Sequence, residues 1–382
     1  MKKSLYLTSA LVAAGVLALG STATMAASKA KPMKIGVSGS YKVMLGYATN
    51  SSGYTVGTGT STTQTSYNDV DVKTDSEIHF KGSVKTDSGM TVGVAVELET
   101  DQTSSANNID GSYVTLGGDF GTIMLGSSAS AAAILAVNAP NTGALGATGP
   151  DASAWVVKPA AVSVGAAAGA NIGGNDSHKI RWNSKAFSGF TIGGSYIPST
   201  TSSNGMPANG GTAGTEASQA DVAVKYSGKM GANTISASAA YWAQDSGTTS
   251  YDATSMGLSV TAGAFTVGLG IKDVNSEGKA ADGTPITGSA SSVDEEAVNV
   301  GAQWAQGSTT LSLNYFKVEQ ERATATAGED SVEKVTLGAK YAMGPGVDFL
   351  GTVQNVKWGD ESTTDTNNNK GMAIVGGISV KF

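Results

Sequence analysis

Apolar and polar positions alternate through the end of the chain, from Lys370 to Phe382. Apolar side chains occupy every second position from Met372 to Phe382 apart from Gly376, and the positions between them carry Ala, Val, Gly, Ser and Lys. A period of two predicts a β-strand, because successive side chains of a strand point to opposite faces. The stretch is long enough for a tilted strand to cross a membrane, which takes about 9–11 residues. A soluble sandwich can also end in such a strand, so the rest of the chain must decide.

The same alternation recurs along the chain. It runs from Lys34 to Tyr47, from Glu77 to Val84 and from Thr91 to Glu99. On the later strands the apolar set is Ile235, Ala237, Ala239, Tyr241, Met256, Leu258, Val260, Phe265, Val267, Leu269, Ile271, Leu311, Leu313, Tyr315, Val335, Leu337, Ala339 and Tyr341. The opposite set is Thr234, Ser236, Ser238, Ser255, Gly257, Ser259, Thr266, Gly268, Gly270, Thr310, Ser312, Asn314, Lys334, Thr336, Gly338 and Lys340. A face this polar does not pack a dry core, so we expect it to line water and the apolar face to meet lipid.

Short turns alternate with long polar connections. The short turns lie at Asp87–Gly89, Gly117–Asp119, Ser188–Gly189, Gly228–Gly231, Ala262–Gly263, Ala305–Gly307 and Gly344–Gly346. The long connections are 49–67, 101–108, 128–177, 198–219, 245–252, 275–294, 323–330 and 359–369. Seven short and eight long connections predict sixteen strands with both chain ends on the short-turn side. This plan is typical of an all-β, antiparallel transmembrane β-barrel, and about 16 strands are wide enough for an aqueous channel.

The composition agrees with a chain of many strands. Only 14% of the 382 residues are charged, against about 25% in ordinary soluble domains. A helical membrane protein would show apolar runs of about 20 residues, and none follows the first 26 positions. The chain has no cysteine, which excludes a disulfide framework and thiol chemistry. Its formal charge of −7 argues against a nucleic-acid partner.

Residues 1–26 have the organisation of a cleaved signal peptide. Lys2 and Lys3 precede an apolar core from Leu5 to Leu19, and Thr24-Met25-Ala26 offers small residues before a cut at Ala27. We therefore expect an exported protein whose barrel domain spans residues 27–382. A single anchoring helix is the alternative, although the apolar core is short.

Charged residues on the polar face are candidate determinants of ion preference, because rings of charge bias wide channels. The candidate pore-lining bases are Lys34, Lys42, His79, Lys81, Lys179, Arg181, Lys225, Lys272 and Lys340, and the acids are Glu77, Glu97 and Glu99. Bases outnumber acids on the walls, whereas the long connections are acidic. We expect near-neutral or mild selectivity with no decisive residue. Lys179 and Arg181 are singled out because they follow the longest connection, and their joint replacement by Ala is expected to favour cations.

Two segments read as hairpins, Tyr113–Ser127 (YVTLGGDFGTIMLGS) and Lys179–Tyr196 (KIRWNSKAFSGFTIGGSY), and the chain ends on the aromatic Phe382. Both hairpins and the aromatic end resemble those of the Gram-negative general porin family, and of its alphaproteobacterial members most of all. The resemblance implies a homotrimer of sixteen-stranded barrels in the outer membrane, surrounded by lipid, with the third long loop folded into the lumen. It also implies that Phe382 is the signal that the outer-membrane assembly machinery reads.

The third long connection, 128–177, departs from the pattern common in that family. Many porins place several carboxylates on this loop, opposite a row of arginines, but here its only acids are Asp151 and Asp176 and its only strong base is Lys158. We expect a short helix at 131–137, an apolar anchor at 155–157 and a weak transverse field. The alternative is a loop that lies over a neighbouring subunit or over the pore mouth.

Passive diffusion of small hydrophilic solutes and ions is the function that these features predict. A substrate-specific channel is an alternative, although most aromatic residues fall on the lipid face. A structural or adhesive barrel is another, and the loop 360–369 carries oxygen ligands of the kind calcium takes, without a known calcium-loop spacing. An enzyme is not expected, because neither G-x-S-x-G nor H-E-x-x-H occurs around the two histidines, His79 and His178. No cofactor, metal or catalytic residue is predicted.

Overall fold

In a computed structural model, the described part of the chain forms antiparallel strands and one short helix. The structure describes residues 32–51, 68–100, 109–146, 155–164, 172–173, 177–200, 218–245, 249–279, 285–286, 293–322, 328–362 and 367–382. The first strands are β1 (Lys34–Ala48), β2 (Val70–Lys85), β3 (Thr91–Glu99), β4 (Ile109–Gly118), β5 (Gly121–Ser127), β6 (His178–Asn183), β7 (Phe190–Ile197) and β8 (Ser218–Met230). The later strands are β9 (Asn233–Asp245), β10 (Thr249–Ala262), β11 (Phe265–Lys279), β12 (Pro285–Ile286), β13 (Val293–Gln306), β14 (Thr309–Arg322), β15 (Glu329–Gly344), β16 (Val347–Gly359) and β17 (Asn369–Lys381). The helix is α2 (Ala131–Leu135).

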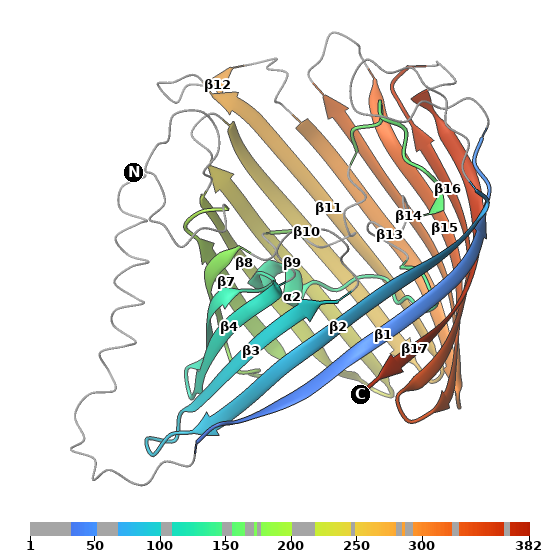
Figure 1. Cartoon of the computed structure of the whole chain (residues 1–382). Coiled ribbons are helices and arrows are strands. Elements are labelled where there is room, and N and C mark those ends of the chain that lie inside the picture. The colour runs from blue at the N-terminus through green and yellow to red at the C-terminus, as the bar shows by residue number, and fades with distance from the viewer. Residues whose placement is uncertain are drawn as a thin grey trace.

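The strands close into a barrel (Figure 1). Each long strand pairs with its neighbours in sequence, and the ring closes where β1 pairs with β17. The two-residue β12 pairs only with β11 and lies outside the ring, so sixteen strands form the wall within the described residues. Closure continues to the last residue, since Gly39 and Phe382 exchange backbone hydrogen bonds of 2.9 and 3.1 Å. The predicted sixteen-stranded antiparallel barrel is confirmed.

The predicted connections are found with two differences in length. All seven short turns join the strands that the sequence indicated. However, β9 continues to Asp245 and β10 begins at Thr249, so 245–252 is mostly strand. Likewise β11 runs to Lys279 into the predicted connection 275–294. Where a strand continues beyond the membrane, both of its faces can be polar. Such residues lack the apolar and polar alternation and therefore resemble a loop in the sequence, which accounts for both differences.

The outward face of the barrel is apolar, and parts of its inward face are shielded from solvent. Val37, Met256, Val267 and Leu313 are among the exposed apolar residues on the outside. Inside, Lys334 and Thr336 are 1% and 0% exposed, which corrects the expectation that this face lines water throughout. These inward side chains are covered by another part of the protein, because residues of the 128–177 connection pack against the inner wall.

Three apolar clusters lie inside the barrel. The first joins Val156, Val162 and Val164 to Ala297, Phe316, Val318, Val332, Val356 and Trp358. The second joins Ala144, Leu145 and Trp155 to Met44, Ala48, Leu350, Ala373 and Val375. The third joins Ala132, Leu135 and Ile172 to Ala223 and Ala253. In each cluster residues from the 128–177 connection meet strand residues, so apolar burial holds this connection against the inner wall.

Among the described residues no helix has the length and apolarity needed to span a membrane. The predicted signal peptide, residues 1–26, lies outside the residues that the structure describes.

Candidate pore and its inward loop

The inward connection begins with the helix α2. Ser130 caps it by accepting a hydrogen bond from the Ala133 backbone N–H, the role expected of a serine at a helix start. The barrel holds the other free N–H groups of the first turn. Ala131 N–H donates to Ser195 Oγ at 2.7 Å, and Ala132 N–H donates to Asp221 Oδ1 at 2.8 Å. The short helix expected at 131–137 is present over Ala131–Leu135.

Beyond α2 the chain crosses the inner wall from strand to strand. Its backbone bonds to strand side chains, and these bonds join Val137 N to Ser238 Oγ (2.8 Å), Ala139 N to Asn299 Oδ1 (3.3 Å), Thr142 N to Ser312 Oγ (3.0 Å), Ala144 N to Thr352 Oγ1 (2.8 Å), Asn314 Nδ2 to Pro140 O (2.7 Å) and Lys334 Nζ to Gly146 O (3.0 Å). Glycines on the strands give the room for this approach. A Cβ at Gly257 would meet Val137 O at 1.8 Å, and one at Gly338 would meet Thr142 O at 1.7 Å.

The segment 155–164 is anchored at the opposite side of the barrel. Trp155 is 5% exposed and Val156 is fully buried, so the predicted apolar anchor is present. Trp358 Nε1 donates to Val156 O at 3.0 Å, and Asn369 Nδ2 donates to Val157 O at 2.6 Å. We call residues 128–146 and 155–164 together the inner belt. The belt lies along the inside of β7 to β11 and of β13 to β17.

Lys179 and Arg181 bind the first residues of the inner belt. Lys179 is 3% exposed, and its ammonium group donates to Ser128 O and, at 2.8 Å, to Ser177 O. Arg181 Nη1 donates to Ala129 O. The structure therefore places the pair under the loop and not on a wall open to water. These cations bind backbone carbonyl groups, which gives them a structural role.

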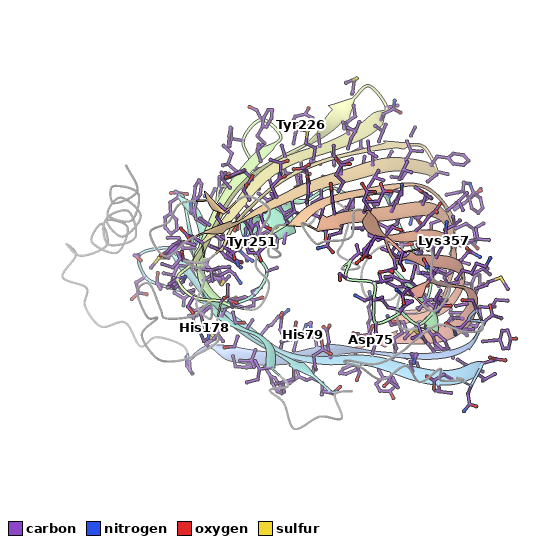
Figure 2. The ribbon with its side chains drawn as sticks, turned by 90° about the horizontal axis from the view of Figure 1, so that it is seen from above. Asp75, His79, His178, Tyr226, Tyr251 and Lys357 are labelled. Atoms are coloured by element: carbon purple, nitrogen blue, oxygen red, sulfur yellow. The ribbon has the colours of Figure 1, made fainter. Side chains whose placement is uncertain are left out.

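One wall of the barrel carries a run of charge. The inward positions of β2 are Asp71, Lys73, Asp75, Glu77, His79 and Lys81 in succession. Figure 2 shows Asp75 and His79 pointing into the interior. We call these six residues, with Lys42 of β1 and Glu97 of β3, the charged wall.

Most charges of this wall are paired within it. Lys42 pairs with Asp75, and Lys81 Nζ lies 2.6 Å from Glu97 Oε1. Lys73 Nζ lies 2.6 Å from Asp71 and 5.0 Å from the centre of the Trp155 ring, so it also contacts the inner belt. His79 Nε2 lies 2.7 Å from Glu77 Oε2 and its Nδ1 lies 3.2 Å from Lys81 Nζ. The wall thus presents alternating and mutually compensating charge.

The remaining candidates are scattered. Lys272 forms a buried ion pair with Glu295 at 2.6 Å and has little exposure to the lumen. Lys34 is exposed at the end of β1, whereas Lys225, Lys340 and Glu99 are half-buried on their strands. Asp151 and Asp176 lie outside the described residues.

Sequence reasoning missed Asp71, Lys73 and Asp75 because it began the second strand at Glu77, whereas β2 begins at Val70. Extending the alternation of Glu77 and His79 by three more inward positions would have found them. It also missed the apolar inward residues Phe316, Val318 and Trp358, although the same parity places them inside.

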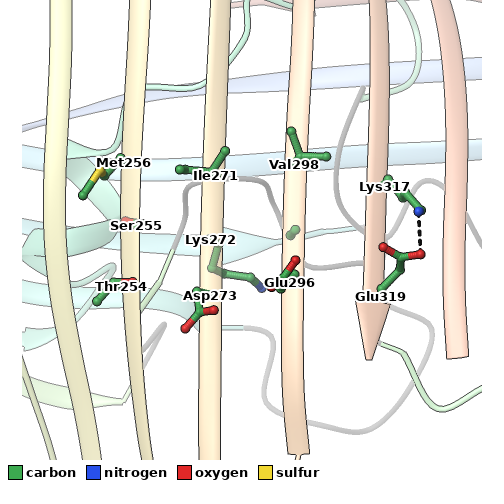
Figure 3. A pocket seen from close by; sticks show the side chains of 11 residues that line it. Thr254, Ser255, Met256, Ile271, Lys272, Asp273, Glu296, Val298, Lys317 and Glu319 are labelled. Carbon is green, nitrogen blue, oxygen red and sulfur yellow. Dashed lines mark ion pairs between the residues drawn. The ribbon is translucent and has the colours of Figure 1, made fainter. Parts of the chain in front are cut away.

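A depression between β10, β11, β13 and β14 faces outward (Figure 3). Met256, Ile271 and Val298 form its apolar floor. Lys317 and Glu319 pair across its rim at 2.5 Å. Because its exposed lining residues have the outward parity, it belongs to the outer surface and not to the channel.

Comparisons with known proteins agree with this geometry. A family model described as Gram-negative porin matches residues 10–360. The anion-selective porin from Comamonas acidovorans superposes with a TM-score of 0.61 and 18% identity, over 92% of this chain and 100% of that chain. A porin refined at 1.8 Å gives a TM-score of 0.59 and 19% identity over 91% and 100% of the two chains. The trimer form of OmpT, an outer membrane protein of Vibrio cholerae, gives a TM-score of 0.59 and 12% identity over 92% of this chain and 100% of that chain. No curated protein sequence matches.

Proposed function

Since the chain belongs to the Gram-negative porin family and forms a porin channel in the outer membrane, we propose that it passes small hydrophilic solutes and ions by passive diffusion with weak ion selectivity. The observation that carries this proposal is the one-sided distribution of charge inside the barrel. The charged wall compensates its own charges, through Lys42–Asp75 and Lys81–Glu97 among others. The belt facing the lumen from the other strands is built mainly of Ala, Val and Ser, and Lys158 is its single charged residue. A strong transverse field needs opposed rows of unlike charge, and this arrangement lacks them among the described residues.

We further propose that the inner belt sets the size limit of the pore. The belt occupies space inside the barrel, and it is held by apolar burial and by hydrogen bonds to several strands. A pore narrowed by a fixed loop with few charges separates solutes mainly by size. The weak ion selectivity then comes from the charged wall, because charge on the wall attracts or repels the ions that pass close to it. The Comamonas acidovorans relative is described as anion-selective, and a mild anion preference is the direction favoured by Lys34, Lys225 and Lys340, inward lysines outside the charged wall.

The test is the reversal potential of the refolded protein in a planar bilayer under a salt gradient. The double variant Lys42→Gln, Lys81→Gln is expected to shift preference toward cations. Its matched counterpart, Asp75→Asn with Glu97→Gln, removes the partners of the same two pairs and is expected to shift preference toward anions. The variant with all four changes keeps the net wall charge and should behave like the parent. Strong cation selectivity of the parent, or a shift in the same direction in both double variants, would contradict the proposal.

The assembly and processing of the protein complete this proposal. We propose a homotrimer exported with cleavage of residues 1–26, because the V. cholerae relative is described in a trimer form and the first residues have the pattern of a signal peptide. We also propose that the assembly machinery reads Phe382. Its side chain is 63% exposed although its backbone closes the barrel on Gly39, so the ring is available to a partner.

We propose no catalytic activity. His79 is held between Glu77 and Lys81 on the charged wall, and His178 is exposed at the start of β6. A nucleophile next to a positioned base is the arrangement that covalent catalysis needs. A chromogenic ester assay of the refolded protein, with a His79→Gln variant as control, should show no turnover above buffer.

A further inference from the structure

Three carboxylates gather where β15 begins and β16 ends. Asp330 is the second residue of β15, and Asp360 and Glu361 directly follow β16. One carboxylate oxygen from each of the three lies within 4.8 Å of the others. We call these residues the carboxylate cluster. Neither the pore mechanism nor the comparisons account for it.

The cluster has no ion-pair partner in the part of the chain that the structure describes. Among the described residues no lysine, arginine or histidine forms an ion pair with any of its members. Three like charges this close repel one another unless a cation or a proton neutralises them. Their proximity therefore requires a positive partner.

Asp330 is the most buried member of the cluster. Its side chain is 4% exposed, and its Oδ2 accepts a hydrogen bond of 2.5 Å from Ser163 N–H in the inner belt. Its Oδ1 is buried and accepts no hydrogen bond from an N–H group or a hydroxyl group, so only a protonated Glu361 could donate to it. A buried carboxylate oxygen without a donor costs free energy, because it has lost water and gained nothing in exchange. The other two members are partly exposed, so water can reach the cluster from one side.

We propose that Asp330, Asp360 and Glu361 bind a divalent cation of the calcium type. Calcium takes six to eight oxygen ligands at about 2.3–2.6 Å and accepts carboxylates together with water. The buried Asp330 Oδ1 would supply one ligand, the Asp360 and Glu361 carboxylates the others, and water the open positions. Softer metals prefer nitrogen and sulfur ligands, which this cluster does not contain.

The position of the site gives the ion a structural consequence. Ser163, which donates to Asp330, lies between Val162 and Val164, and both valines are buried in the apolar cluster on the inside of β13 to β16. A cation on Asp330 and Glu361 thus fastens the belt segment 155–164 to the ends of two strands. Gly328, directly before β15, allows the start of β15 to come close to the end of β16, since a Cβ there would lie 2.6 Å from Glu361 Cβ.

A proton competes with the cation for this place. Hydrogen bonding to Asp330 is the main cause that raises the pKa of Glu361 to about 7. Without a cation, Glu361 is therefore partly protonated at neutral pH and shares that proton within the cluster.

Equilibrium dialysis with radioactive calcium tests the proposal on the full-length, refolded protein, freed of lipopolysaccharide and treated with chelator. The parent is compared at pH 7.5 with Glu361→Gln and Asp330→Asn, and with Asp87→Asn, which removes an exposed acid in the β2–β3 turn. Calcium is titrated to about 10 mM, because extracellular calcium sites bind at about 0.1–1 mM. Circular dichroism verifies that each variant has folded.

The parent and Asp87→Asn are expected to bind one calcium ion per chain with the same affinity. Glu361→Gln is expected to bind calcium at least about tenfold more weakly. Calcium should also raise the unfolding temperature of the parent and not that of Glu361→Gln. Equal binding by all four proteins would overturn the proposal, as would an unfolding temperature that calcium leaves unchanged. Displacement of the bound calcium by an equal concentration of magnesium would overturn the assignment to the calcium type. Asp330→Asn provides a second test at the buried ligand should Glu361→Gln fail to fold.

Discussion

Trp358 on β16 donates from its indole Nε1 to the carbonyl oxygen of Val156 on the inner belt, 3.0 Å away. Both residues are buried, at 1% and 0% exposure. The bond lies inside an apolar cluster, so the carbonyl group has little access to another donor. A strand residue with inward parity thus holds the loop that occupies the lumen.

Replacing Trp358 should loosen the belt without opening the barrel. Trp358→Ala is expected to cost about 3–5 kcal/mol, because it leaves a large cavity. Trp358→Phe keeps most of the volume and should cost about 1–3 kcal/mol, because Val156 O becomes an unsatisfied buried acceptor. Urea unfolding in lipid vesicles measures both. Greater current noise in the Ala variant would show that the loop moves; equal stability of the two variants would mean that the hydrogen bond alone matters.

A methyl group at Gly338 should displace the belt. Its Cβ would lie 1.7 Å from Thr142 O, far inside contact distance, so Gly338→Ala must move either the belt or β15. Overpacking of this kind costs about 1–3 kcal/mol. The matched control is Gly376→Ala on β17, whose Cβ would meet nothing within 4 Å. Single-channel conductance should change only in the Gly338 variant, and an unchanged conductance would place the narrowest point away from Thr142.

Joint replacement of Lys179 and Arg181 by Ala should now act mainly on structure. The two side chains donate to carbonyl groups of Ser128, Ala129 and Ser177, so their loss leaves buried acceptors unsatisfied. Each lost charged donor is worth about 1.5–3 kcal/mol. We expect lower stability and a more variable conductance, with little change in reversal potential. A clear shift toward cations with unchanged stability would instead restore the interpretation that the pair lines the pore.

Stability of the calcium-free protein should depend on pH through Glu361. Hydrogen bonding to Asp330 raises the pKa of Glu361 from 4.5 to about 7 in the folded state, so its protonated form is favoured there. The stabilisation is complete below pH 4.5 and is lost as the pH rises through about 7. Unfolding temperatures measured in chelator across this range should fall, and Glu361→Gln should remove that part of the fall. The same fall in the variant would assign the effect to other groups.

Phe382→Ala separates folding from assembly in the cell. The Phe382 side chain is 63% exposed, so the change should alter the stability of the refolded protein by less than about 0.5 kcal/mol. If assembly factors read the ring, the amount in the outer membrane should fall strongly. Leu313→Ala, also exposed on the outward face, is the control and should assemble normally. An equal yield of both variants would exclude the terminal aromatic ring as the signal.

The wall of the barrel was predictable because lipid imposes a rule on every strand. A lipid-facing residue must be apolar, so period-two alternation marks Val267 or Leu313 from the sequence alone. The rule ends where the strands leave the lipid. At Tyr315 and Phe316 the pattern inverts, with the charged Lys317 and Glu319 outside and Val318 inside. Beyond this point the inward face packs against the belt and not against water.

The interior was less predictable because its contacts join distant parts of the chain. Trp155 was expected to be an anchor, yet nothing local in the sequence indicates that it lies against Gly46 and Val375. The burial of Lys334 depends on Gly146, a neighbour only in space. The carboxylate cluster, too, joins Asp330 and Glu361 from different strands.

The course of the inner belt also dictates an order of events during folding. The belt bonds to Thr352 and Trp358 near the end of the chain, and Trp155 packs on Val375. These partners lie on β16 and β17, the last two strands of the chain, and share one surface only after these strands have paired. Contacts between such distant positions form late, because the chain between them must first be ordered. We therefore expect a newly closed barrel to conduct more than the finished pore until the belt has docked.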